Sequence, residues 1–318
     1  MSVINTNNAS NIAQNAIRIN EQQMSVAMER LSTGSRINSA KDDAAGLAIS
    51  ERMSSQISGL NMATRNANDA ISMLQTIEGA TKEISNMLGR MRELTVQSAS
   101  GTYTSTDRAA LDLEFGALMD EISRIAKNTE WNGDGVLQGT LSQNYSSDDT
   151  ALAKTIQIGT DSGQTMALSI KTWVPTVASA DTDNIGSFGN GDGANSAYGA
   201  TTALFGDADS ASDLTNQVRL NITSVANTVD ALQEIDNAIN GAAAERAKYG
   251  AYMSRLQHAS DNLQNVSTNT AASRSQIADA DYAAETTELA RTQIISQAST
   301  AMLAQANQVK QTVLSLLK

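Results

Sequence analysis

The chain has 318 residues, a net charge of −12 and no cysteine, with a single proline and only 3% aromatic residues. The acidic balance argues against binding to phosphate backbones, and the lack of cysteine excludes disulfides, zinc–thiolate sites and thiol nucleophiles. No run of about 18 apolar residues occurs, so we expect no membrane insertion. The apolar residues are mainly Ala, Ile, Leu and Met, a composition that favours long helices.

The N-terminal segment carries two heptad rows of apolar residues. The rows are Ile12, Ile19 and Val26, and Ile17, Met24 and Leu31. They lie roughly 140° apart on an α-helix and so define a broad apolar face. Such a face predicts a helix that needs a partner.

The next segment predicts one long helix after a short turn. Gly34 is expected to end the first helix, and Ser39 with Asp42 has the spacing of a capping box for the second. Between residues 49 and 91, apolar side chains recur at steps of three and four. This periodicity predicts an uninterrupted helix that reaches about residue 100.

A third helix and a β-hairpin are expected to follow. Thr106 can cap the third helix. Its apolar row consists of Leu111, Phe115, Leu118, Ile122 and Ile125. After the turn pairs Asn132-Gly133 and Asp134-Gly135, apolar residues alternate on either side of a turn at 159–163, which predicts a hairpin. Residues 172–215, rich in Gly, Ser, Ala, Thr and Asp, predict a small irregular insertion.

The C-terminal third again predicts helices. A fourth helix is expected from about residue 225 to 270, with the apolar row Val225, Val229, Leu232, Ile239, Met253, Leu256 and Leu263. The chain closes on a heptad row made of Ile295, Met302, Val309 and Leu316. Heptad rows at both ends of the chain favour a coiled coil that joins the two termini. The alternative is an ordinary amphipathic helix packed on a globular body.

Motifs that carry catalysis or metal binding are missing from the sequence. His258 is the single histidine and lies in a helical pattern, so histidine-based metal sites and a Ser-His-Asp triad cannot be built. The acidic pairs Asp42 with Asp43 and Asp279 with Asp281 stand near expected helix starts, where capping explains them. We therefore expect no catalytic, cofactor or metal site, and a function that lies in surfaces.

Four long motifs resemble the terminal signatures of bacterial flagellins. They are LSTGSRINSAKDDAAGLAISERM, GRMRELTVQSASGT, SRSQIADADYAAET and the closing LAQANQVKQTVLSLLK. They occur in the family's order and at the chain's two ends, and the resemblance covers roughly residues 1–140 and 220–318. It implies a non-enzymatic structural subunit that polymerises into the extracellular flagellar filament used for swimming.

Periodicity and resemblance together imply a mainly α fold. It would be an elongated bundle of long helices and a terminal coiled coil, with a β-hairpin and a small irregular outer insertion. We expect residues 1–42 and 277–318 to form the two strands of an inner coiled-coil domain. Residues 43–171 and 216–276 would form a surrounding helical shell, and residues 172–215 the outer variable insertion.

The resemblance also implies partners. The first is the chain itself, through heterologous contacts in an open helical filament. Others are the flagellar export apparatus, a flagellin export chaperone, and the filament cap and junction proteins. Export through the hollow filament fits the N-terminus MSVINTNNASNIAQ, which lacks the basic and apolar parts of a cleavable signal. No cofactor and no nucleic acid are expected.

The heptad rows supply the residues that we assign to polymerisation. They are Ile12, Ile17, Ile19, Met24, Val26, Leu31, Ile295, Met302, Val309 and Leu316. Burying one such side chain contributes roughly 1.5 to 3 kcal/mol, whereas ordering the backbone costs about 1 to 2 kcal/mol per residue. We therefore expect the terminal segments to be disordered in the monomer and to fold on assembly.

The resemblance further assigns a recognition patch. In the family, a Toll-like innate immune receptor of animals binds the outer side of the helical shell, around residues that match Arg90, Leu94 and Glu114. The alternative interpretation makes Leu94 a packing residue and Arg90 with Glu114 a solvated ion pair.

Three other functions compete with the filament subunit. A hook–filament junction subunit also has heptad termini, but the RELTVQSA and LAQANQV stretches and the insertion favour the filament subunit. A flagellin with a protease in its insertion would need a histidine cluster, which a single histidine excludes. An added adhesin role for residues 172–215 stays open.

Overall fold

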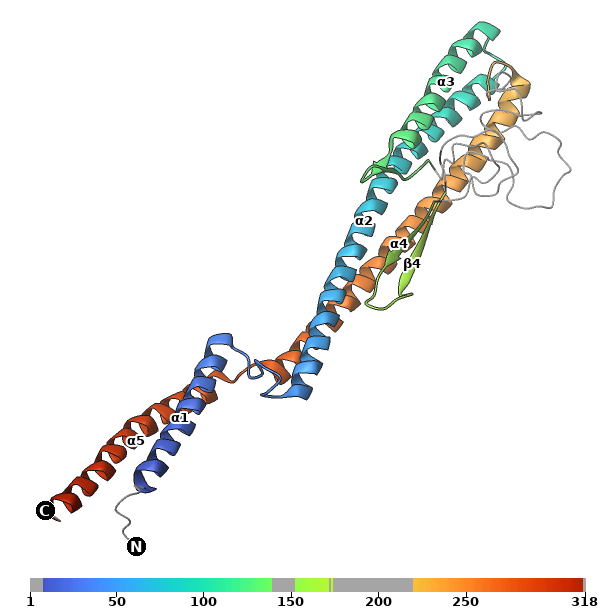
Figure 1. The fold of residues 1–318 in the computed structure, drawn as a ribbon. Helices are drawn as coiled ribbons and strands as arrows, with labels where there is room; N and C mark the ends of the chain where they lie inside the picture. The colour runs from blue at the N-terminus through green and yellow to red at the C-terminus, as the bar shows by residue number, and fades with distance from the viewer. Residues whose placement is uncertain (1–7, 139–151, 172, 174–219, 317–318) are drawn as a thin grey trace. The chain divides into compact units, whose positions relative to one another are not determined.

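The computed structural model describes residues 8–138, 152–171, 173 and 220–316 and divides the chain into two compact units. Unit 1 comprises Met1–Gly59 and Asn265–Lys318, and unit 2 comprises Leu60–Gln264. The described elements are α1 (Asn8–Thr33), α2 (Ala44–Ala99), α3 (Ser105–Asn128), β1 (Glu130–Trp131), β2 (Asp134–Gly135), β3 (Leu152–Gln157), β4 (Thr165–Ile170), α4 (Val225–Ala278) and α5 (Tyr282–Leu316) (Figure 1). The mainly α fold expected from the sequence is confirmed.

The N-terminus of α2 is capped four residues later than expected. Asp43, not Ser39, accepts a hydrogen bond from Gly46 N at 2.8 Å and so caps the helix. Asp42 instead closes the preceding turn, because its Oδ2 accepts bonds from the backbone N and the hydroxyl of Ser39, each at 3.0 Å. These hydrogen bonds, the Ser39 backbone bond above all, lower the pKa of Asp42. Only glycine fits at position 46, because a Cβ there would lie within 2.6 Å of Asp43 Oδ2 and Ile37 Cδ1.

The cap of α3 also differs from the expected one. Thr104, not Thr106, is the N-cap, and its hydroxyl accepts a hydrogen bond from Asp107 N. Asp107 Oδ2 in return accepts a bond from Thr104 N at 2.9 Å, which completes a capping box. Both threonines precede an apolar helical pattern, so periodicity alone does not show which of them caps the helix. The sequence feature that distinguishes Thr104 is Asp107, the carboxylate three residues later that completes the capping box.

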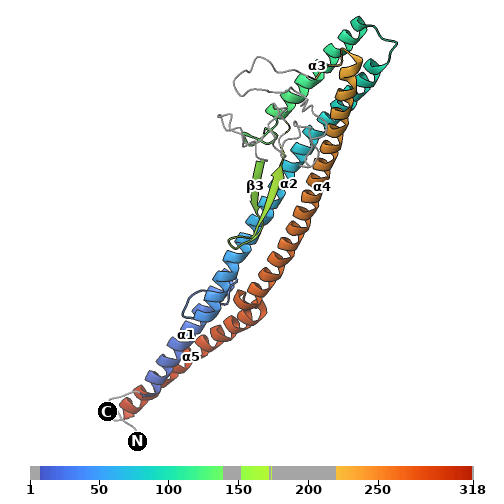
Figure 2. The ribbon, with the colours of Figure 1, turned by 90° about the vertical axis from the view of Figure 1, so that its right-hand side faces the viewer.

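Two β-hairpins pack in unit 2. The short strands β1 and β2 pair around Asn132 and Gly133, whose φ values of 53° and 82° suit an Asn-Gly turn. Strands β3 and β4 form the antiparallel hairpin that the alternation predicted, and their register places Leu152 opposite Ile170. Figure 2 shows this hairpin lying against α2, where Asn66 Nδ2 donates to Gln157 O at 3.3 Å.

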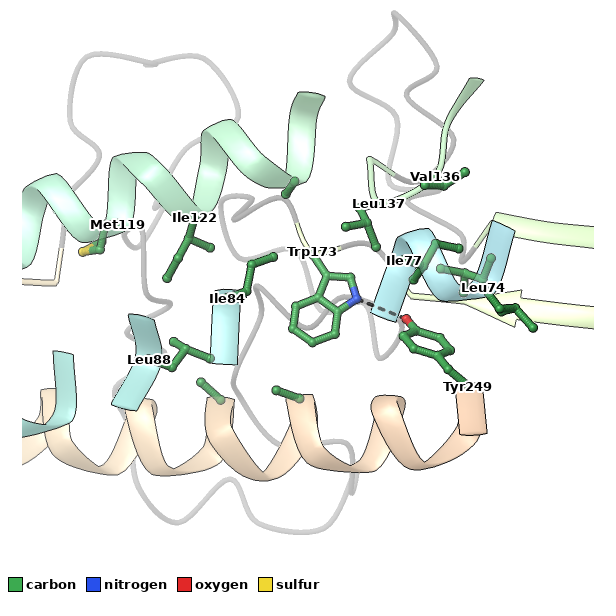
Figure 3. Close-up of a cluster of buried hydrophobic side chains, with 14 of the residues drawn as sticks. Leu74, Ile77, Ile84, Leu88, Met119, Ile122, Val136, Leu137, Trp173 and Tyr249 are labelled. Carbon is green, nitrogen blue, oxygen red and sulfur yellow. Dashed lines mark hydrogen bonds between the residues drawn. The ribbon is translucent and has the colours of Figure 1, made fainter. Parts of the chain in front are cut away.

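The core of unit 2 lies between α2, α3, α4 and the hairpins. Its fully buried large side chains include Leu74, Ile77, Ile84, Leu88, Met119, Leu137 and Tyr249, which Figure 3 labels. Phe115 and Leu168 are equally buried. Trp173 belongs to this core: its Nε1 donates to Tyr249 Oη at 3.2 Å and its backbone N donates to Leu137 O at 2.9 Å. The expected insertion at residues 172–215 otherwise lies outside the described residues.

The apolar row expected on α4 is partly wrong. Val225 and Val229 are 44% and 63% exposed, whereas the residues that face the core are mostly small. The buried residues of α4 are Thr228, Ala231, Ile235, Ala238, Ala242, Glu245, Tyr249, Leu256, Ser260, Leu263 and Ser267, so Leu256 and Leu263 of the expected row are buried as predicted. Small side chains allow the backbone of α4 to approach its neighbours closely, so alanine rather than valine marks the buried face here.

Candidate assembly surface

Helices α1 and α5 of unit 1 lie side by side, as the two terminal heptad patterns predicted (Figures 1 and 2). Their contact face consists of buried and half-buried residues spaced alternately by three and four. On α1 these are Ser10, Ala13, Ile17, Asn20, Met24, Ala27 and Leu31, and on α5 they are Glu285, Leu289, Thr292, Ser296, Ser299 and Leu303. This seam has the spacing of a coiled coil.

Two polar contacts fix the direction and register of the pair. Asn20 Nδ2 donates to Thr292 O at 2.7 Å inside the seam, and Arg30 Nη1 lies 3.1 Å from Glu285 Oε1 at its end. A later residue of α1 thus meets an earlier residue of α5, so the helices run antiparallel. The Arg30–Glu285 pair is largely shielded from water, with 30% and 13% of the two side chains exposed.

The connections that leave α1 and enter α5 are tied to each other. Gly34, at φ +70°, ends α1 as expected, and its carbonyl oxygen accepts a bond from Ala280 N at 3.0 Å. Arg36 donates from its backbone N to Ala278 O and from Nη2 to Ile277 O, both at 2.7 Å. Asp281 then caps α5 by accepting from Ala283 N at 2.9 Å. These bonds fix where the terminal pair begins.

The seam uses only some of the residues that we assigned to polymerisation. Ile17, Met24 and Leu31 lie in it. The other described members of the rows are exposed, by 71% at Ile12, 47% at Ile19, 38% at Val26, 39% at Ile295 and 67% at Met302. The expectation that the C-terminal row itself joins the termini is therefore wrong for Ile295 and Met302. The side chains of Val309 and Leu316 lie outside the described ones.

The exposed rows of α1 and α5 share one side of the pair. When each helix is viewed from its own N-terminus, its exposed row is rotated anticlockwise from its seam residues, by about 120° on α1 and about 90° on α5. Because the two helices run in opposite directions and face each other through the seam, rotations in the same sense place both exposed rows on the same side of the pair. The register set by Asn20 and Thr292 places Ile12 at about the level of Met302, and Ile19 at about the level of Ile295. We call these four residues, together with Val26, the assembly strip: Ile12, Ile19, Val26, Ile295 and Met302.

Comparison with known proteins decides the family. The model of the bacterial flagellin N-terminal helical region matches residues 4–142, and that of the bacterial flagellin C-terminal helical region matches residues 232–317. The chain belongs to the bacterial flagellin family. Polar flagellin F of Vibrio parahaemolyticus is 36% identical and flagellin B of Vibrio anguillarum 35% identical, each over 99% of both chains. A flagellin is a structural subunit of the flagellar filament and not an enzyme.

One solved structure shares the fold at low identity. A putative flagellar hook-associated protein from Vibrio parahaemolyticus superposes with a TM-score of 0.55 at 13% identity, covering 75% of this chain and all of that one. This likeness concerns the fold alone. The flagellin names of the full-length relatives favour the filament subunit over the hook–filament junction subunit.

The residues assigned to receptor binding in this flagellin fall into two environments. Arg90 and Glu114 are half exposed and joined, with Arg90 Nη2 2.8 Å from Glu114 Oε1, and Glu93 adds a second carboxylate at 3.0 Å. These hydrogen bonds, that of Glu114 first, raise the pKa of Arg90. Leu94 is 1% exposed and belongs to the core of unit 2. A partner can therefore touch the ion pair, while Leu94 acts through packing.

Sequence reasoning missed the polar members of the seam. Asn20, Thr292 and Ser299 are at most 7% exposed, although a search for apolar heptads passes over them. These polar residues could have been found from their spacing, because they continue the alternating steps of three and four on which Ile17, Met24 and Leu303 also lie. In the described part of the chain, no helix is long and apolar enough to cross a membrane, and no three His, Cys, Asp or Glu side chains gather as a metal site.

Proposed function

We propose that this flagellin polymerises through the assembly strip, which packs against other surfaces of neighbouring copies. The observation that carries the proposal is the position of five large apolar side chains on one side of the α1–α5 pair, exposed by 38% to 71%. Scattered exposed apolar residues are ordinary, but a contiguous strip along two paired helices is typical of an interface. Contact between two different surfaces generates an open helical filament. Val309 and Leu316 would extend the strip toward the C-terminus.

We infer that the terminal pair gains much of its stability only on assembly. Half of its described seam consists of Ala, Ser, Thr and Asn, which bury little apolar area. Each ordered residue costs about 1 to 2 kcal/mol of backbone entropy, so the seam alone falls short of a stable two-helix unit. Burial of the strip against neighbours supplies the missing stabilisation, and the termini of the free monomer are then disordered.

The same proposal covers export and location. An unfolded terminal pair suits passage through the hollow filament by way of the flagellar export apparatus, and an export chaperone would shield the apolar rows before passage. The cap and junction proteins would meet the strip or its complement at the filament ends. The subunit then resides in the extracellular filament.

We propose a second role for the exposed ion pair of Arg90 with Glu114, as the contact for a Toll-like innate immune receptor. Its support is the accessibility of the two charged groups, each with nearly half of its side chain exposed. Leu94 would hold α2 in place beneath the pair.

The polymerisation proposal is tested by sedimentation of assembled protein. Ile19→Asp combined with Ile295→Asp places two charges at one level of the strip, so we expect no pelletable filament. Ser25→Asp combined with Gln297→Asp puts the same charges on the other side of the same helices, at exposed positions, and should assemble. The proposal fails if the strip variant pellets like the control, provided that circular dichroism reports equal helix content in both monomers.

A further inference from the structure

The loop that leads into α4 carries a triplet of the form Asn-x-Thr. Its residues are Asn221, Ile222 and Thr223, and α4 begins two positions later at Val225. A triplet of this kind is the acceptor motif for a sugar on the asparagine amide, and it serves as one when it stands in a surface loop. Because so short a motif also arises by chance, its surroundings in the structure are decisive.

The other triplets of the form Asn-x-Ser or Asn-x-Thr stand in different surroundings. They begin at residues 8, 144 and 265. The first and the last lie inside α1 and α4, where the hydroxyl residues Ser10 and Ser267 are only 7% and 5% exposed. Two positions on an α-helix are about 200° apart, so in these two triplets the amide and the hydroxyl point to opposite sides. The triplet at 144–146 lies outside the described residues.

The side chain of Asn221 is held through its oxygen. Asn221 Oδ1 accepts hydrogen bonds from Thr223 Oγ1 at 2.9 Å and from Asn227 Nδ2 at 2.5 Å. In the part of the chain that the structure describes, Asn221 Nδ2 donates no hydrogen bond. The nitrogen that would receive a sugar is therefore not engaged, while the hydroxyl of the triplet already contacts the amide.

The residues on either side of Asn221 anchor the loop to unit 2. Leu220 and Ile222 are buried, with 6% and 0% of each residue exposed. Ile222 N donates to Asp112 Oδ1 at 2.8 Å, and Ile222 O accepts from Ser98 Oγ at 2.6 Å. Asn221 itself is half exposed between these two anchors. The triplet is thus presented at the surface in one fixed position.

A hollow on the adjoining surface of α3 provides room for a sugar. It has a volume of about 320 Å³, at the lower end of the range of small-ligand clefts, and is lined by Asp112, Leu113, Gly116, Ala117, Asp120, Leu220 and Asn221. A Cβ at Gly116 would meet no atom within 4 Å, so the space above the helix is open there. Leu113, 78% exposed, offers an apolar surface to the C–H face of a sugar ring.

We propose that Asn221 is a glycosylation site, at which a glycosyltransferase attaches a sugar to Nδ2. Nδ2 forms a bond to C1 of a sugar that is activated by a phosphate leaving group, and the C1–O bond to the phosphate breaks. A base of the transferase takes the proton that Nδ2 loses. Negative charge then develops on Oδ1, and the hydrogen bonds from Thr223 and Asn227 stabilise it. The attached sugar lies over the hollow beside Leu113.

Mass spectrometry of flagellin isolated from the filaments of its own cells tests this site. Trypsin releases residues 220–246 as one peptide, because Arg219 and Arg246 flank it. We expect this peptide to carry a sugar and electron-transfer fragmentation to place the sugar on Asn221. The peptides that contain Asn8 and Asn265 are internal controls with the same motif in a helix, and both should be unmodified.

The composition of the modification identifies the sugar donor. A single sugar, or a series that differs by one sugar at a time, indicates stepwise transfer from nucleotide-activated sugars. One oligosaccharide of fixed composition indicates transfer as a block from a lipid carrier. Either composition on Asn221 supports the site.

Three variants made in the same cells separate the motif from its surroundings. Asn221→Gln and Thr223→Val should both lose the modification entirely, since the first removes the acceptor and the second the hydroxyl. Thr223→Ser keeps the hydroxyl and should retain the sugar. Thermal unfolding followed by circular dichroism should show the same melting temperature for Thr223→Val and Thr223→Ser, because residue 223 is exposed.

Three results would overturn the inference. They are an unmodified 220–246 peptide from native filaments, a sugar on Thr223 or another hydroxyl in place of Asn221, and full modification of Thr223→Val. The first would mean that Asn221 only closes the loop through its hydrogen bond from Asn227. None of these results depends on how the chain polymerises.

Discussion

Asn20 donates a hydrogen bond to the backbone oxygen of Thr292 across the seam of α1 and α5, over 2.7 Å. Its side chain is surrounded by seam residues, with 4% of the residue exposed. Sliding one helix along the other would leave this buried amide without its partner, which is costly. A single polar residue in a coiled-coil seam often sets register in this way. Since the register also aligns the rows of the assembly strip, Asn20 links the pairing of the termini to the surface that they present.

Replacing Asn20 should therefore weaken assembly without touching the strip. Asn20→Ala removes one buried hydrogen bond, worth about 1 kcal/mol, and should raise the critical concentration about five-fold. Gln22→Ala, at an exposed position two residues on, is the control and should assemble like the parent. Light scattering at increasing protein concentration measures both. Equal critical concentrations for the two variants would remove the role assigned to Asn20.

The N-cap of α3 predicts that alanine substitutions at Thr104 and at Thr106 have different effects on the unfolding free energy of unit 2. Thr104→Ala removes the capping box and should lower the unfolding free energy of unit 2 by about 1 kcal/mol. Thr106→Ala, inside the first turn, should leave it unchanged or raise it by a few tenths of a kcal/mol, because alanine has the higher helix propensity. Thermal unfolding followed by circular dichroism decides. A larger loss at Thr106 would reinstate the cap expected from the sequence.

Leu94 and Arg90 should separate stability from recognition. Leu94→Ala leaves a cavity in the core and should lower the unfolding free energy of unit 2 by about 2 to 5 kcal/mol, measured by urea denaturation. Arg90→Ala should unfold like the parent, since it loses only a solvent-exposed ion pair. In a receptor reporter assay on a responsive parent, Arg90→Ala should reduce the signal. A full signal from Arg90→Ala would rule out the ion pair as the receptor contact.

Glu234 predicts a pH dependence of unit 2. Burial, with the charge of Asp230 four residues earlier, raises the pKa of Glu234 from 4.5 to about 7, and its Oε2 is buried without a hydrogen-bond partner. The folded state therefore holds this proton at pH values where the unfolded chain has released it. Its contribution to stability is complete below about pH 4.5 and is lost as the pH rises toward and through 7.

Glu234→Gln should remove this loss. Because the side chain is only half buried, we expect a gain of about 1 to 2 kcal/mol over the parent at pH 8, and little difference at pH 4. Glu83→Gln, at an exposed position of α2, should follow the parent at every pH. Urea denaturation of the three proteins across this range is the measurement. A constant offset between Glu234→Gln and the parent at all pH values would contradict the assigned pKa.

Periodicity was sufficient to predict the helices and the pairing of the termini. Ile17, Met24 and Leu31 stand in the seam, and α2 runs without interruption to Ala99, because apolar spacing is set by helix geometry. The hairpin of β3 and β4 followed from strict alternation about Gly163, whose φ is +88°. These features depend on residues close in sequence.

Assigning faces was less successful, because a face depends on the partner. Ile295 and Met302 were expected to join the termini, but the seam of α5 is built around Thr292, Ser296 and Ser299. An apolar row indicates that these side chains become buried, but it does not show whether the same chain or another copy covers them. For the same reason Val225 and Val229 were wrongly expected to face the core of their own chain. Trp173 gave no periodic signal, since an isolated anchor in a polar stretch has no pattern to join.

The central claim is that neighbouring copies cover the assembly strip in the filament. Electron cryomicroscopy with helical reconstruction of filaments grown from the purified chain tests it most directly. The account predicts long uniform filaments in which Ile12, Ile19, Val26, Ile295 and Met302 are buried against a different surface of adjacent subunits. A filament in which these side chains face solvent or an open channel, while α1 and α5 stay paired, would contradict it.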